Sequence, residues 1–481
     1  MAVNSLETAP TAEERRPQWL IATGIQARVV MRLVLELVTP AHFGVGDVEG
    51  LLDAPILRDA RTGESFIAGA TLAGALRAYL ARKNFPAAKD LFGKQEGSGQ
   101  ASYESWVRVG DARANGGGAQ TELRDGVGIN SVTRTAAAKL KYDFELLQAG
   151  TQFVLTIELM VPKGKPEYEG YLNDAVDGLN GAIRLGKRKR RGFGECRIAS
   201  GQVWKYEFPA DMLRWLDKPL SEDAGEWKEY VPAKAPPVSS EDCVVELTCT
   251  LRSGLLVRAA ASDPNGQARN LPDHEPIRSM RRDDNGVLIS RCILPGTSLA
   301  GVLRARTERI GNTLQPGKGK EWAERLFGKA RGEGHRDTFR ASSLWVDEAV
   351  IESPNECGHT RVKIDRFTGG AYPGALFSEG VLFPSEKTEL TLKLRLEKPD
   401  NAKVGMLLLL VKDLWTGDLP VGGESGVGRG RLRGKRAEIR WNGHTWTLKA
   451  AGKDGEGLEI TASDGAEDLN ELVKMITGGK Q

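Results

Sequence analysis

The chain is poor in cysteine, and its cysteines do not form a disulfide pattern. Five occur among 481 residues, an odd number without paired spacing. Free thiols in a large chain are typical of a reducing compartment, so we expect a cytoplasmic protein. Residues 1–18 contain no apolar core, which argues against a secretory signal.

Long apolar runs and a strong net charge are also missing. No uninterrupted apolar stretch approaches the length of a membrane span, and Met406–Val411 fits a short buried strand or helix segment. We therefore expect no membrane contact. The net charge is only +3, so the overall charge does not indicate a nucleic-acid partner. Hydrophobic residues make up 40% and charged residues 27%, as in ordinary globular proteins.

Common catalytic and metal-binding motifs are absent as well. The glycine-rich segments lack the spacing of a P-loop or of a dinucleotide-binding fingerprint. The sequence has no Ser nucleophile elbow. Cys357 and His359, with His335 and Cys292 elsewhere, are zinc-ligand types, but their spacing is irregular and the first half of the chain has no counterpart. Zinc is therefore not expected.

What the sequence does contain is a repeat of itself. Gly69–Arg77 (GATLAGALR) returns as Gly296–Arg304 (GTSLAGVLR), with six of nine positions identical. Three further segments return in the same order and at a similar offset: Leu91–Lys94 as Leu326–Lys329, Ile129–Ala136 as Ile364–Ala371, and Gly192–Gly194 as Gly426–Gly428. This period is too long for a solenoid and matches a whole domain. The chain is therefore predicted to be two copies of one domain, fused head to tail.

The hydrophobic pattern predicts strands and helices inside each copy. Strands are expected over 27–38, 154–160, 244–251 and 388–395, and helices begin near Thr71 and Ser298. Regular strand–helix alternation is missing, so the predicted class is α+β: two tandem ferredoxin-like domains, each an antiparallel sheet with helices on one face. The predicted division is a flexible arm over 1–26, a first domain over 27–206, a linker over 207–242, a second domain over 243–446 and a tail with a short helix over 447–481.

Two features of the repeat point to anion binding, and a third is a candidate for catalysis. Free amides at the start of the 69–77 helix attract phosphate, and Arg77 can reach an anion; a tightly packed turn is the alternative. Six cations within 184–191 lead into Gly192–Gly194, echoed by Gly422–Arg431, and such loops can follow a phosphate backbone; a solvated hairpin turn is the alternative. Asp53 lies in the loop before the helix, where an Asp is most often a turn former or cap.

Taken in order, these motifs resemble the RAMP (repeat-associated mysterious protein) superfamily. More narrowly, they resemble the fused two-copy backbone subunit of a type III (III-D-like) CRISPR effector complex. The resemblance rests on the His42–Asp47 loop (HFGVGD), on Asp53, on both helix starts and on Ile364–Ala371 (IDRFTGGA). It covers most of both predicted domains.

The resemblance implies a fold and a function. Each copy would be a modified RRM-like domain with an inserted β-hairpin "thumb", which in the first copy falls within 129–145. The protein would bind guide (cr)RNA through phosphate and shape contacts, together with other CRISPR effector subunits, and base pairing would select the target RNA. Family members serve antiviral defence by cutting target RNA opposite each thumb-induced kink, with a loop Asp and Mg²⁺ or Mn²⁺.

Carried over by position, Asp53 and Asp273 are the expected catalytic and metal-binding residues. Asp273 is chosen because DHEPIR (273–278) resembles DAPILR (53–58) with one extra residue before the proline, and Asp263 is the fallback. The expected RNA contacts are His42, Gly44, Gly46, Arg58, Thr71, Arg77, Arg134, Lys187, Arg188, Arg190, Arg191, Ser298, Arg304, Arg366, Thr368, Arg429 and Arg431.

Both copies depart from the family pattern. The second loop, 262–286, is longer and lacks the His-x-Gly-x-Gly motif, and 129–136 lacks the Asp-Arg and Gly-Gly of the family segment. Two alternatives stay open. One is a purely structural guide-RNA scaffold in which Asp53 only shapes its loop. The other is a guide-processing ribonuclease, which in this superfamily usually depends on His.

Overall fold

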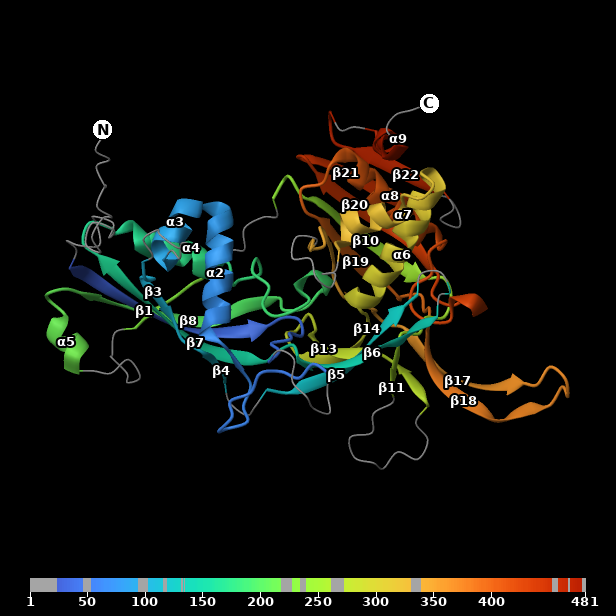
Figure 1. Cartoon of the computed structure of the whole chain (residues 1–481), viewed down its shortest axis with the longest axis horizontal. Helices are drawn as coiled ribbons and strands as arrows, with labels where there is room; N and C mark the ends of the chain where they lie inside the picture. The colour runs from blue at the N-terminus through green and yellow to red at the C-terminus, as the bar shows by residue number, and fades with distance from the viewer. Residues whose placement is uncertain are drawn as a thin grey trace, which may run out of the picture.

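The two sequence copies form two lobes that lie side by side (Figure 1). The computed structural model describes residues 24–45, 53–93, 103–115, 119–130, 133, 135–217, 227–233, 239–260, 272–329, 339–451, 457–465 and 468–477. Each lobe has an antiparallel sheet covered by helices, which confirms the predicted α+β class of two tandem ferredoxin-like domains.

The first sheet is centred on β1, which pairs antiparallel with β7 on one side and with β8 on the other. Along β7 buried and half-buried residues alternate, because successive side chains of a strand point to opposite faces. The buried face packs with helices α2, α3 and α4 into one core. The bounds are β1 Ile25–Leu37, β2 Phe66–Ile67, α2 Gly69–Lys83, α3 Phe85–Phe92, β3 Val107–Val109, β4 Ala112–Ala114, β7 Gln152–Pro162, α4 Glu167–Asp177 and β8 Cys196–Glu207.

The second sheet has the same plan around β10, which pairs with β19 and β20. Its buried face and helices α6, α7 and α8 share a second core. A register shift even recurs at the same place, between Val34 and Leu35 in the β1–β8 pair and between Thr248 and Cys249 in the β10–β20 pair. The bounds are β10 Cys243–Leu251, α6 Gly296–Leu314, α7 Gly319–Phe327, β15 Leu344–Val346, β19 Leu390–Leu396, α8 Asn401–Thr416 and β20 Leu432–Trp441.

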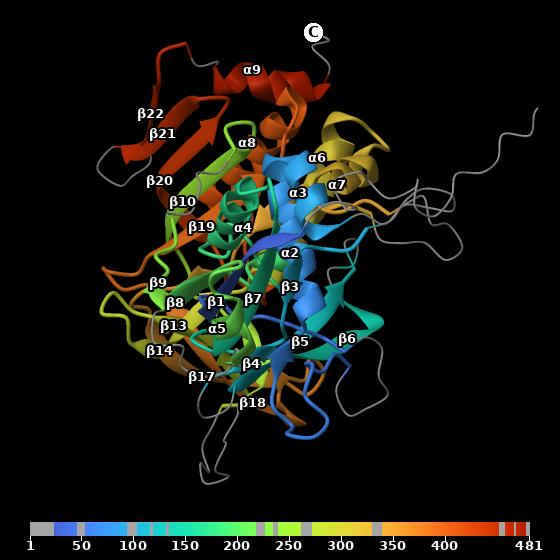
Figure 2. The same cartoon turned by 90° about the vertical axis from the view of Figure 1, so that its left-hand side faces the viewer.

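The chain after each copy closes the same edge of its sheet. In the predicted linker, α5 (Met212–Asp217) packs near β8, and β9 (Lys228–Glu229) pairs with it. After residue 446, where a tail was predicted, the second sheet instead continues through β21 (His444–Ala451) and β22 (Gly457–Ala462). Helix α9 (Leu469–Lys474) then packs on α8, and these elements lie together at one end of the molecule (Figures 1 and 2).

Each copy carries a long β-hairpin. In the first copy β5 (Thr121–Ile129) and β6 (Ala136–Leu147) form it, so the predicted thumb is longer than expected. In the second copy β17 (Asn355–Ile364) and β18 (Ala371–Phe383) form a hairpin that projects away from the lobe (Figure 1). The remaining strands are β11 Arg258–Ala260, β12 His274–Pro276, β13 Arg278–Arg282, β14 Leu288–Leu294 and β16 Ala349–Val350.

The first hairpin is fixed to the second copy by a buried ionic cluster. Glu348 of the second copy binds Arg124 of β5 and accepts a 2.6 Å bond from Arg281 of β13. Glu122 of β5 in turn accepts bonds from Arg124, at 2.6 Å, and from the Ser279 hydroxyl, at 3.0 Å. The Arg124 and Glu348 side chains are only 3% and 2% exposed, so the cluster is inside the junction between the copies.

We predict that Glu348→Gln loosens this junction. Removing the carboxylate leaves two buried guanidinium groups short of negative charge, and loss of one partner of a buried pair typically costs about 3–5 kcal/mol. Small-angle scattering should show a larger radius of gyration, and denaturant unfolding should separate into two steps. Glu352→Gln is the control, because its pair with Arg291 is partly exposed. An unchanged radius in Glu348→Gln would contradict the prediction.

Candidate active site

Asp53 lies against the returning strand of the first hairpin. Its side chain is exposed to solvent, and its Oδ2 accepts a 2.9 Å hydrogen bond from the backbone N–H of Asp143 in β6. The next residue, Ala54, forms a parallel bridge with Phe144 and accepts a bond from the N–H of Glu145. The carboxylate is therefore held at the edge of the hairpin and remains open to a ligand.

Asp273 occupies the equivalent position in the second copy. Its Oδ2 accepts a 2.7 Å bond from the backbone N–H of Ser378 in β18, and the Ser378 hydroxyl lies 3.3 Å from the same oxygen. The next residue, His274, pairs in parallel with Glu379. Both candidate aspartates thus accept a bond from the corresponding amide of their own hairpin.

The register of the two loops corrects one prediction. The N–H of Leu57 donates to the carbonyl of Phe43, and the N–H of Ile277 donates to the carbonyl of Val257, which are equivalent bonds. The offset between the loops is therefore constant from the aspartate onward, so no residue is inserted in the second loop. Pro276 stands at the position of Ile56, and the two prolines that the sequence comparison matched are not equivalent.

The surroundings of the two carboxylates differ in charge. Asp125 faces Asp143 across the first hairpin, whereas Thr360 faces Ser378 across the second. A hydrogen bond with Asp125, added to the repulsion from that carboxylate and from Asp53, raises the pKa of Asp143. Two further carboxylates thus lie near Asp53, at the hairpin positions where the second copy has Thr360 and Ser378.

Neither site is a complete metal cage. Within the described ranges, no group of three or more His, Cys, Asp and Glu side chains could hold an ion. Mg²⁺ is commonly bound by one or two carboxylates together with water and substrate phosphates. Asp53 and Asp273 each fit that partial role. A bound ion would supply positive charge at the scissile phosphate.

Half of the predicted basic run binds at the junction between the copies. The run includes the short 3₁₀ helix η1 (Lys189–Arg191). Three of its arginines bind the second copy: Arg184 binds Asp347 at 2.5 Å, Arg190 binds Glu397 at 3.0 Å, and Arg191 donates to the Leu344 carbonyl at 3.0 Å. Burial, with the nearby charges of Arg190 and Arg304, lowers the pKa of Arg191 to about 10. Arg190 and Arg191 therefore join the two copies. An RNA phosphate at either residue would have to bind a guanidinium group that already has a partner within the protein.

The corresponding loop of the second copy, η3 (Ser425–Val427), has the same backbone but different chemistry. In the first copy the residue before η1 is Arg188, and its guanidinium group stacks on Phe144, 4.3 Å from the ring centre. Beneath η3, Glu424 and Glu379 share Arg429. Arg429 is only 5% exposed, so the prediction that it contacts RNA does not fit its position.

His42 is likewise a structural residue. It is buried, and its Nδ1 donates a 2.8 Å bond to the carbonyl of Glu145, which fastens the loop to β6. Burial and the charges of Lys187 and Arg188 lower the pKa of His42, although its bond to Glu145 acts in the opposite direction. An added side chain at Gly44 would meet the His42 ring, so glycine is required here for space.

The helix starts are already partly occupied by the protein. The N–H of Gly69 donates to the Asp111 carboxylate at 2.8 Å, and the carbonyl of Arg191 packs against Gly296. The first amide of α2 is therefore bound to a carboxylate of the protein, where the sequence predicted a phosphate. Further along each helix the surface is open: Thr71 and Arg77 of α2 are exposed, and Ser298 and Arg304 of α6 are half-buried.

The remaining predicted RNA contacts lie at other places. Arg366 and Thr368 are exposed in the turn of the β17–β18 hairpin, beside Phe367, which is 91% exposed. Lys187 and Arg431 are also exposed, and Arg58 binds Glu145. Gly46, Arg134 and the fallback Asp263 are outside the described residues.

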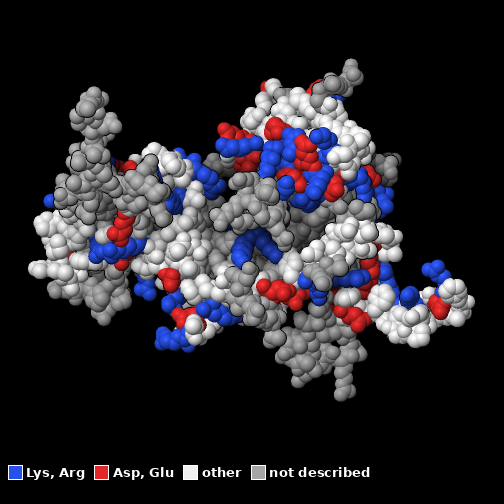
Figure 3. Space-filling model, in the orientation of Figure 1, with Lys and Arg blue, Asp and Glu red and all other residues white. Residues whose placement is uncertain are grey.

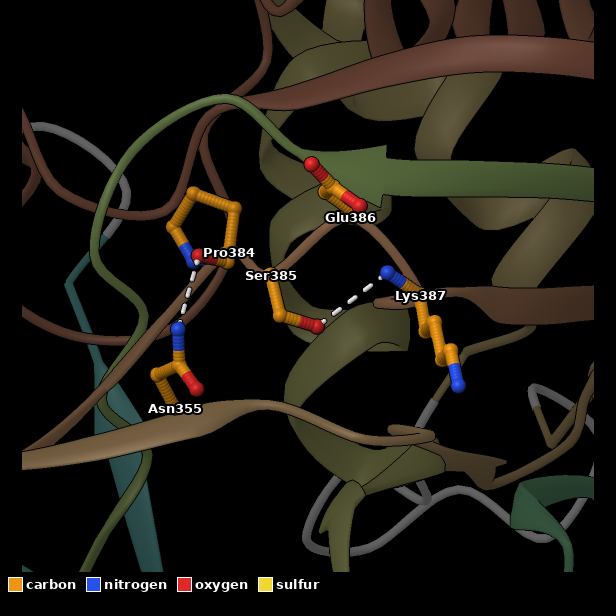
Figure 4. A pocket seen from close by; sticks show the side chains of 5 residues that line it. All are labelled: Asn355, Pro384, Ser385, Glu386 and Lys387. Atoms are coloured by element: carbon orange, nitrogen blue, oxygen red, sulfur yellow. Dashed lines mark hydrogen bonds between the residues drawn. The ribbon is translucent and has the colours of Figure 1, made fainter.

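Two surface features complete the description. Lys and Arg side chains gather in a hollow between the two lobes (Figure 3). A shallow pocket lies at the base of the second hairpin and is lined by Asn355, Pro384, Ser385, Glu386 and Lys387 (Figure 4). Its interactions are local, such as the 3.2 Å bond from the Lys387 N–H to the Ser385 hydroxyl. The pocket is separate from Asp273, which binds further along β18.

A family model confirms the relationship that the motifs suggest. The RAMP superfamily model matches residues 34–197 and 280–433, more than half of the chain and one region in each copy. The chain belongs to the RAMP superfamily, which is associated with CRISPR complexes and includes ribonucleases. The first matched region contains Asp53, and the second begins after Asp273. No curated protein matches the chain. None of the described helices is both long and apolar enough to cross a bilayer.

We predict that His42 makes stability depend on pH. Because its pKa is lowered in the folded state, protons bind more readily to the unfolded chain, and stability is lost as pH falls through a histidine's usual value near 6.5. His42→Asn retains a donor for the Glu145 carbonyl but cannot titrate. Its melting temperature should be lower at pH 8 and should fall less steeply toward pH 5 than that of the wild type. Parallel pH profiles would count against this role.

Proposed function

We propose that this chain is a backbone subunit of a type III CRISPR ribonucleoprotein, which binds guide RNA along both copies and cleaves complementary target RNA at two regularly spaced positions. Asp53 and Asp273 would act in cleavage, one in each copy. The observation that carries the proposal is that both carboxylates are exposed and accept a bond from the equivalent backbone amide, Asp143 in β6 and Ser378 in β18.

The chemistry asks little of the protein beyond a positioned carboxylate. In each aspartate one oxygen is fixed by the hairpin, and Oδ1 has no hydrogen-bond partner among the described residues. Such an oxygen can accept a proton from the attacking 2′-hydroxyl or orient a hydrated Mg²⁺ or Mn²⁺ at the phosphate. Target selection needs no base-reading side chains, because pairing with the guide performs it.

Removing the charge from each aspartate tests the proposal. In the guide-loaded complex with Mg²⁺, Asp53→Asn should abolish one product band and Asp273→Asn the other, while guide binding is unchanged. Asn keeps an oxygen acceptor for the hairpin amide, so the loop should stay in place. Labelled target RNA resolved on a gel gives the readout. If every band persists in the double variant while guide binding is intact, the chain is a scaffold instead.

The open faces of α2 and α6 are the surface that we expect the guide to approach. Gly74 and Gly301 lie at equivalent, exposed positions, and a Cβ added at either would meet no atom within 4 Å. A glycine inside a helix costs about 1 kcal/mol relative to alanine, and packing within the protein does not require it here. A closely approaching RNA backbone would require it, and Arg77 is exposed one turn further on.

Alanine substitutions separate these explanations. Gly74→Ala and Gly301→Ala should each raise the free energy of unfolding by up to about 1 kcal/mol and should weaken guide binding severalfold in a filter-binding assay. Gly170→Ala in α4 is the matched control, since its added Cβ also meets open space. It should stabilise the protein without changing guide affinity. Equal guide affinity in all three variants would place the guide elsewhere.

A guide-processing ribonuclease is the second candidate. Such enzymes in this superfamily usually depend on His, but His42 is buried and bonded to Glu145. His359 is exposed on the second hairpin, at the place where the first hairpin has Arg124. Cleavage of precursor guide RNA by this chain alone, lost in His359→Ala, would favour this candidate.

A further inference from the structure

The segment that follows Asp53 is held on the hairpin by one side chain, Glu145. The N–H of Ile56 donates to its Oε2 at 3.2 Å, and Arg58 binds its Oε1 at 2.6 Å. The Glu145 side chain is 9% exposed, whereas that of Arg58 is 40% exposed. A buried carboxylate with two partners from one segment acts as a clamp, because its loss leaves both partners unpaired.

The second copy lacks this glutamate, and it also lacks the donor that the glutamate binds. Gly380 corresponds to Glu145, and a Cβ at this glycine would lie 3.2 Å from Cδ of Pro276. Pro276 corresponds to Ile56 and has no N–H to satisfy. The carboxylate and its backbone partner are thus absent together.

The arginine five residues after the aspartate is present in both copies, and it is bound in both. Arg278 corresponds to Arg58, and it pairs with Glu356, which comes from β17 and not from the returning strand β18. The Arg278 and Glu356 side chains are 42% and 39% exposed. The same arginine is therefore clamped by a buried acid in the first copy and by an exposed acid in the second.

We propose that Glu145 and Glu356 are the positioning residues of the two candidate sites, each acting through the arginine that follows its own loop aspartate. The expected effect on cleavage rests on the proposed function. The contacts of Glu145 and Glu356 with the loops do not depend on it. The clamp reassigns Arg58 from a predicted RNA contact to a loop anchor.

The first test is the pattern of product bands. Glu145→Gln should slow the band that depends on Asp53 by about 10-fold to 100-fold in single-turnover cleavage, since a misplacement near 1 Å can cost this much. Glu356→Gln should slow only the band that depends on Asp273. The unaffected band reports in each case that the complex is folded and loaded. Glu386→Gln, an exposed acid at the base of the same hairpin, is the matched control and should change neither band. Equal slowing of both bands, or of none, would overturn the inference.

A charge swap adds a readout that simple loss of stability would not reproduce. Glu356→Arg and Arg278→Glu should each lose the second band, and the double variant should recover it, because both side chains are exposed enough to exchange places. Higher salt should also weaken the second band relative to the first, since exposed pairs are screened more strongly. A double variant as slow as the single variants would refute the assignment of Glu356.

Hydrogen exchange tests the clamp without any cleavage. In the guide-loaded complex, Glu145→Gln should increase exchange in a peptide covering 53–59 but not in one covering 273–279, and Glu356→Gln should do the reverse. If the wild-type complex does not cut RNA but these shifts appear, the proposed function fails while the clamp stands. If the wild type cuts and the exchange is unchanged in both variants, the clamp fails alone.

Discussion

The burial of Glu348 is the constraint on which the arrangement of the two copies depends. A carboxylate that is 2% exposed must be matched by positive charge, and Arg124 from one copy and Arg281 from the other supply it. Since Arg124 lies on β5, the same interaction fixes the first hairpin on the second copy. Asp53 rests on that hairpin, so the ionic cluster sets the position of one candidate site relative to the other. The fused domains therefore hold their two candidate sites at a fixed separation.

Equivalent backbones are filled with different chemistry in the two copies. The η1 and η3 loops share their left-handed ends, at Arg188 and Glu424 respectively. Beneath them, stacking of an arginine on phenylalanine in the first copy is replaced by acids and arginines in the second. The duplication therefore preserved hydrogen-bond geometry, which depends on the backbone, while side chains in contact changed together. The replacement of Ile56 and Glu145 by Pro276 and Gly380 follows the same rule.

The repeat in the sequence was enough to predict two domains, and family motifs led to Asp53 and Asp273, whose geometry is equivalent. The sequence could not reveal that Glu145 anchors the loop. Its partner Arg58 is 87 residues away, and strand pairing across such a distance leaves no local pattern. The charge of the basic run was visible in the sequence, but the partners of its side chains were not. Arg190, predicted to contact RNA, pairs with Glu397 of the second copy. The prediction missed β21 and β22 because the repeated sequence motifs end at Gly428, before either strand begins.

The closing of the first sheet by β9 has a consequence for synthesis. Every strand of that sheet precedes residue 230, and the linker strand that completes it is made before β10 begins. A ribosome emits only a few to tens of residues per second, and domains generally fold in order as they emerge. The sheet of the first copy can therefore be complete while the second copy is still being translated. The later copy then docks on a folded sheet, and its Glu348 and Arg281 fix the first hairpin only at that stage.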